Sequence, residues 1–166
     1  MAQVQIKRLN DRAILPAHGS PDAAGYDLYA CLDADVTVPP HATVKIGTGL
    51  SLALPEGTFG AVFARSGLAA KEGLRPANCV GVCDSDYRGE YIIALHNDSD
   101  SPRVVRHGDR IAQLVLLPYL PMDFEEVVAL SATITNGGEN VLSDVFSLVI
   151  SCFTFYLANN IKKLAK

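Results

Sequence analysis

The chain has 166 residues, the length of one domain or of one domain with an appended tail, which leaves little room for a second catalytic module. Fourteen Lys and Arg against 18 Asp and Glu give a formal net charge of −4, which excludes the basic footprint of a nucleic-acid-binding protein and a polybasic membrane patch. A hydrophobic share of 49% excludes wholesale disorder.

Short apolar runs with a period near two follow one another from Val4 to about Tyr119, and turn residues rich in Gly, Pro, Asn and Asp separate them. This pattern predicts strands at residues 4–6, 36–38, 50–54, 58–64, 91–97, 103–106 and 110–118, and a single helical turn at 68–72. In the first three runs one face is expected to lie on a core. Many short strands without alternating helices indicate an all-β barrel or jelly-roll-like sandwich.

The two ends of the chain predict where the protein resides. Residues 141–158 are rich in apolar side chains but contain one Asp and four hydroxyl residues, so a packed C-terminal segment, or a stretch under no selection, is favoured over membrane contact. The N-terminus has no apolar leader, which argues against secretion.

The four cysteines, at positions 31, 79, 83 and 152, form no CxxC pair. A reducing cytoplasm therefore fits best, without a zinc site or a disulfide framework.

The strongest local motif is residues 81–89, GVCDSDYRG, where an apolar stretch suddenly presents two acids, an aromatic ring and a base between two glycines. If the segment stays extended, alternation places Asp84 and Asp86 on one face. The two carboxylates are suited to binding a metal, or one of them to acting as a base on water. The alternative is a hairpin with solvated charges.

Two further segments carry polar groups beside apolar strands. Arg65-Ser66-Gly67 stands just before the helical turn, where backbone N–H groups, an Arg fork and a hydroxyl suit a phosphate. The alternative is a helix N-cap Ser with a surface Arg. Residues 108–114, GDRIAQL, taken alone are a turn followed by a core strand. The four histidines, together with Asp98, Asp100 and Asp109, are interpreted as surface or turn residues.

Four segments, PDAAGYDL at 21–28, RSGL at 65–68, GVCDSDYRG at 81–89 and GDRIAQL at 108–114, occur in the order and at the spacing of four motifs of the homotrimeric deoxyuridine triphosphatase (dUTPase) family. The sequence resembles that family over about residues 3–130. The resemblance implies a distorted jelly-roll barrel, the dUTPase-like β-clip, assembled as a homotrimer with active sites shared between subunits. It also implies hydrolysis of dUTP to dUMP and pyrophosphate with Mg²⁺.

The resemblance also implies residue roles. Asp84 activates the water that attacks the α-phosphorus, Tyr87 lies under the deoxyribose and excludes a 2′-hydroxyl, and Asn78 helps the hairpin backbone to read uracil. The implied phosphate ligands are Arg65, Ser66, Gly67 and Gln113. No side chain binds Mg²⁺ directly, since phosphates and water hold it. Asp27 supports that water shell or an arginine across the subunit interface.

The sequence departs from the family at two places. Cys83 stands where an aliphatic residue is usual, and we expect it to pack as a small hydrophobe. The fifth motif, an Arg- and Gly-rich arm with a Phe, is not found, so the chain is divided into a domain of residues 1–130 and an atypical tail of residues 131–166. Without the arm, turnover is expected to be reduced. The alternatives are a catalytically impaired dUTP-binding or protein- or membrane-interacting member of the fold, and a dCTP deaminase.

Overall fold

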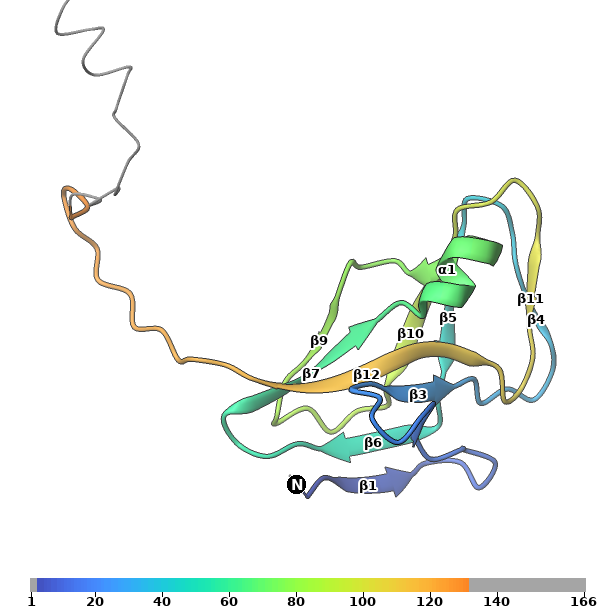
Figure 1. Cartoon of the computed structure of the whole chain (residues 1–166), viewed down its shortest axis with the longest axis horizontal. Helices are drawn as coiled ribbons and strands as arrows, with labels where there is room; N and C mark the ends of the chain where they lie inside the picture. Colours follow the sequence, from blue (N-terminus) through green and yellow to red (C-terminus); the bar gives the residue numbers. More distant parts are fainter. Residues whose placement is uncertain (1–2, 132–166) are drawn as a thin grey trace, which may run out of the picture. The chain divides into compact units, whose positions relative to one another are not determined.

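The computed structural model describes residues 3–131, and most of its regular structure is β-strand (Figure 1). The chain divides into a compact unit, Met1–Met122, and a second unit that begins at Asp123. The elements are β1 (Gln5–Arg8), β2 (Ala17–His18), β3 (Tyr26–Tyr29), β4 (Val36–Val38), β5 (Thr43–Gly47), β6 (Leu50–Ala53), β7 (Thr58–Phe63), α1 (Ser66–Glu72), β8 (Leu74–Pro76), β9 (Gly81–Cys83), β10 (Ile92–Asn97), β11 (Arg103–Val105) and β12 (Arg110–Pro118).

The strands pair antiparallel in one large and three small sheets. The large sheet has the order β2-β3-β12-β7-β9, and β5-β10-β8, β1-β6 and β11-β4 form the others. The longest strand, β12, lies between β3 and β7 (Figure 1). Neighbours in these sheets are mostly distant in sequence, so β12 brings residues from three separate parts of the chain together. The all-β prediction is confirmed.

Within the described residues the core is a cluster of mostly aliphatic side chains to which each of the four sheets contributes, although the strands β1 and β2 add no buried residue. Its largest fully buried apolar members are Leu28, Ile46, Leu50, Leu95, Ile111 and Val38. In β12 two successive residues, Ile111 and Ala112, are both buried, because the register against β3 shifts between Arg110 and Ala112. Such a bulge lets a strand turn a further side chain inward.

The predicted strand runs are confirmed as β1, β4, β6, β7, β10, β11 and β12, and the helix begins at Ser66, two residues before its predicted start. The sequence pattern missed β2, β3, β5, β8 and β9. These strands have two to five residues, and Gly or Pro stands in or next to each of them and interrupts the apolar runs. Long-range pairing rather than local pattern therefore defines them.

The predicted core face at residues 4–6 is confirmed only in part. Val4 is half-buried and packs against the core, whereas all four residues of β1 are exposed and Ile6 keeps 38% of its surface accessible. In the single chain β1 pairs only with β6, and Ile6 lines an open apolar groove. Within residues 3–131 no helix is long and apolar enough to cross a membrane. The segment 141–158 lies outside the described residues.

Candidate functional site

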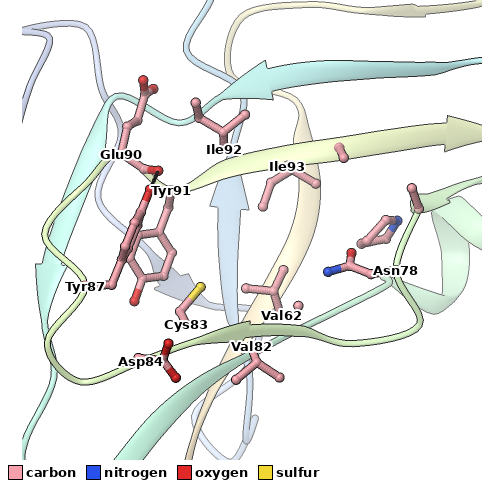
Figure 2. A pocket seen from close by; sticks show the side chains of 14 residues that line it. Val62, Asn78, Val82, Cys83, Asp84, Tyr87, Glu90, Tyr91, Ile92 and Ile93 are labelled. Atoms are coloured by element: carbon pink, nitrogen blue, oxygen red, sulfur yellow. Dashed lines mark hydrogen bonds between the residues drawn. The ribbon is translucent and has the colours of Figure 1, made fainter.

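A cavity of about 420 Å³ opens between the two larger sheets. Strands β7, β8, β9 and β10 line it together with the connections 77–80 and 84–91, and three predicted site residues, Asn78, Asp84 and Tyr87, belong to its wall. Figure 2 shows Asn78 at one end, with Asp84 and Tyr87 at the other. The volume lies within the range of small-molecule sites.

Asp84 follows β9 and begins a tight turn. The Tyr87 N–H donates to the Asp84 carbonyl at 3.2 Å, and Arg88 Nη1 donates to the carbonyls of Ser85 at 2.6 Å and Tyr87 at 3.0 Å. The segment is therefore not extended, so strand alternation does not place Asp84 and Asp86 on one face. The turn leaves both carboxylates exposed, and Asp84 belongs to the cavity wall while Asp86 does not.

Tyr87 is held in place by its own chain neighbours. Its hydroxyl donates to the Glu90 carbonyl at 3.0 Å, the dashed line in Figure 2, and its ring lies 6.0 Å from the Tyr91 ring. The ring also covers Gly89, where an added Cβ would come within 2.6 Å of Tyr87 Cζ. A side chain at position 89 would therefore displace the Tyr87 ring from this position.

We expect that Gly89→Ala displaces the Tyr87 ring and raises the KM for the substrate about tenfold, because a methyl group and the ring cannot share this space. Steady-state kinetics beside a thermal unfolding scan measures the effect. Gly19→Ala is the matched control, since a Cβ there meets nothing within 4 Å. An unchanged KM in Gly89→Ala would contradict the packing described above.

The floor of the cavity is neutral. Tyr91 is 2% exposed, and burial raises the pKa of its hydroxyl. Burial also raises the pKa of the Cys83 thiol, which lies beside Tyr91 and packs against the core as predicted. Both groups stay protonated at neutral pH, so neither acts as a nucleophile there. Asp84 and Glu90 are the carboxylates of this cavity.

A second group of polar residues gathers around Asp27 on β3, which is 8% exposed. Its Oδ1 accepts from Arg65 Nε at 2.6 Å, and its Oδ2 accepts from Arg110 Nη1 at 3.3 Å. Both partners belong to the same chain. Within the single chain Asp27 thus forms an ion pair with two arginines, which accounts for the burial of its carboxylate. Its support of the metal's water shell or of an arginine across the subunit interface stays a prediction.

Gln113 on β12 contacts the same segment from the other side. Its Nε2 donates to the Ala64 carbonyl at 2.9 Å, and Gly25 leaves room for the amide, since a Cβ there would come within 2.6 Å of Gln113 Oε1. Arg65 is the N-cap position of α1 and makes no side-chain cap bond. The alternative of a Ser66 N-cap is wrong because Ser66 is the first helical residue.

The described chain keeps the two groups of predicted site residues apart. Asn78, Asp84 and Tyr87 share one cavity, whereas Arg65 lines another, of about 330 Å³, with Arg110. The exposed residues Ser66 and Gly67, and the half-buried Gln113, line neither.

Sequence reasoning missed two polar contacts near the cavity. Glu90 Oε1 accepts from the Gly49 N–H at 2.7 Å, which ties the loop after Tyr87 to the turn between β5 and β6. A Cβ at Gly47, the last residue of β5, would collide with this carboxylate, so this glycine was the sequence signal for the contact. Asp98 is not a purely solvated turn acid, because both its oxygens accept from Arg75, at 2.6 and 3.0 Å. This pair lowers the pKa of Asp98.

The fold and cavity define an antiparallel β protein whose cavity is lined by an amide, a carboxylate and aromatic side chains. A family model described as dUTPase matches residues 11–143, and the chain belongs to the dUTPase family. The match runs past residue 130, the predicted end of the domain.

Named relatives agree with this assignment. The deoxyuridine 5′-triphosphate nucleotidohydrolase of Desulfitobacterium hafniense is 55% identical over 111 residues, 66% of this chain and 74% of the relative. The enzyme of the same name from Syntrophotalea carbinolica is 47% identical over 81% of this chain and 92% of its own length. The solved dUTPase of Staphylococcus bacteriophage 80alpha with dUPNHPP has a TM-score of 0.73 at 25% identity, covering 83% of this chain and 95% of that one.

Proposed function

We propose that the protein hydrolyses dUTP to dUMP and pyrophosphate. The observation that carries the proposal is the gathering of Asn78, Asp84 and Tyr87 around one cavity in a member of the dUTPase family. The curated relatives are named for this activity. Water supplies the oxygen that bonds to the α-phosphorus, and the bond from that phosphorus to the bridging oxygen of pyrophosphate breaks.

Each of the three cavity residues has a distinct role. Asp84 accepts a proton from the attacking water, for which an exposed carboxylate at the rim of the cavity is suited. Tyr87 supports the deoxyribose and leaves no space for a 2′-hydroxyl. Asn78 offers an amide donor and acceptor to the uracil edge, so a base with the opposite pattern leaves polar groups unpaired.

The triphosphate is bound by Arg65, Ser66, Gly67 and Gln113 of a neighbouring subunit in a homotrimer. Two observations support this division. These residues lie outside the cavity of their own chain that holds Asp84. An apolar groove of about 520 Å³, lined by Val4, Ile6, Leu15, Pro16, Ala24, Tyr26, Leu52, Leu54, Leu114 and Leu116, is open in the single chain, and such a patch is typical of an interface.

The metal is Mg²⁺, carried by the triphosphate and water. Within residues 3–131 no cluster of three or more His, Cys, Asp or Glu side chains is placed to hold an ion, and the Asp27 carboxylate is occupied by two arginines. This donor set fits a metal that arrives with the substrate. Bound Mg²⁺ supplies charge neutralisation to the phosphates. A phage phi11 dUTPase variant of the same fold is described with a structural Mg(II) ion.

The function belongs to residues 1–130, and residues 131–166 are an atypical tail. The cytoplasm, where deoxynucleotides are made, is the proposed location. Because the tail lacks a recognisable fifth motif, turnover is lower than in a member that has it.

Pyrophosphate release from dUTP, dCTP and UTP by the purified full chain with Mg²⁺ tests the proposal. We expect turnover of dUTP alone, sedimentation of the protein as a trimer, and loss of turnover when Mg²⁺ is removed with EDTA. Pyrophosphate release from dCTP would instead indicate a broader hydrolase, whereas a deaminase would release ammonia from dCTP and leave the triphosphate intact. Tight dUTP binding without turnover would favour the catalytically impaired alternative.

A further inference from the structure

Arg75, on β8, makes four hydrogen bonds that none of the roles above uses. Its Nε and Nη2 donate to the two oxygens of Asp98, at 2.6 and 3.0 Å, which is a bidentate ion pair. Its Nη1 donates to the carbonyls of Pro76 at 3.1 Å and Ala77 at 3.4 Å. The guanidinium thus joins the turn after β10 to the backbone immediately before Asn78.

The backbone that Arg75 contacts leads into a connection with little support of its own. Residues 77–80 link β8, in the sheet with β10, to β9, in the sheet with β7. All four are exposed, so their side chains bury little surface that would order the segment. The Ala77 N–H donates to the Ala94 carbonyl of β10 at 2.7 Å. The carbonyls of Pro76 and Ala77 accept from Arg75, so the guanidinium fixes the start of the segment from its other side.

We propose that Arg75, anchored by Asp98, is a positioning residue that holds the connection 77–80 in the conformation in which Asn78 reads the nucleobase. Arg75 is outside the cavity wall and touches no substrate. It acts through the carbonyls of Pro76 and Ala77, the two residues that precede Asn78. This inference rests on the proposed function, since it assigns base recognition to that segment.

The pair is placed for local positioning rather than for global stability. Its side chains keep 39% and 46% of their surface exposed, and an ion pair this exposed to water contributes little to the free energy of unfolding. Its effect is therefore expected in ligand affinity. A lysine at position 75 keeps the positive charge but lacks the planar fork that bonds the carboxylate and the carbonyls together.

The test compares the full-length wild type with Arg75→Lys, Asp98→Asn and the double variant. We expect each to raise the Kd for dUMP and the KM for dUTP about tenfold, with kcat within about twofold and an unchanged Tm. dUMP is the chosen probe because it reports the base and sugar subsite without the terminal phosphates. The double variant is expected to lose no more than the stronger single change, since both remove one unit.

Asp33→Asn is the matched control, because Asp33 also pairs with an arginine, Arg12 at 3.0 Å, on an exposed surface away from the cavity. Hydrogen exchange of the amides at 77–80, without ligand, is expected to accelerate in Arg75→Lys and not in Asp33→Asn. Unchanged exchange and unchanged dUMP affinity would overturn the inference. If the wild type neither hydrolyses dUTP nor binds dUMP, the proposed function fails, while exchange at 77–80 still decides whether Arg75 orders the segment.

Discussion

Asp84→Asn is expected to lower kcat for dUTP by a factor on the order of 10² to 10⁴, the usual contribution of a general base. The amide has the shape of the carboxylate but cannot accept the proton of the attacking water. Because Asp84 is exposed and lies in a turn held by Arg88 and by backbone bonds, the variant is expected to fold normally and to bind dUMP.

Asp86→Asn is the control for this change. Asp86 is also exposed and lies in the same turn, but it does not line the cavity. Pyrophosphate release measured for both variants, together with dUMP binding by calorimetry, separates loss of chemistry from loss of binding. Equal losses of kcat in the two variants would show that the charge of the turn, and not one base, supports the reaction.

The second large effect is expected from Asp27→Asn, which we predict to lower the free energy of unfolding by about 3 kcal/mol. The change leaves Arg65 without its carboxylate, and the Arg65 side chain is only 25% exposed. Removing one partner of a buried ion pair is strongly destabilising, because the remaining charge stays buried without a counter-charge. The same change frees Arg65-Ser66-Gly67, so turnover of dUTP should fall as well.

Thermal unfolding at a fixed protein concentration measures this effect, and a drop in Tm of roughly 10 °C is expected. Asp33→Asn is again the comparison, because its carboxylate is 92% exposed and its ion pair should contribute less than about 1 kcal/mol. Similar Tm values for the two variants would mean that the Asp27 pair adds nothing to stability beyond a surface contact.

The apolar runs of the sequence predicted part of the strands that build the core. The run at residues 110–118 became β12 with the predicted bounds. The strands β3 and β5, which carry the buried Leu28 and Ile46, were missed. The residues of β3 and β9 become strand only because they pair with β12 and β7, which are distant in sequence.

By itself the sequence determined the fold class and the family, because turn residues, apolar periodicity and four ordered motifs are local properties of the chain. It also predicted which residues carry chemistry. Only the tertiary structure decided which of those residues meet. It brought Asn78 and Asp84 to one cavity and paired Asp27 with Arg65 and Arg110. It also paired Asp98, which was expected to be a solvated turn acid, with Arg75 through both carboxylate oxygens. Such contacts depend on strand order and register between distant segments, and no local pattern records them.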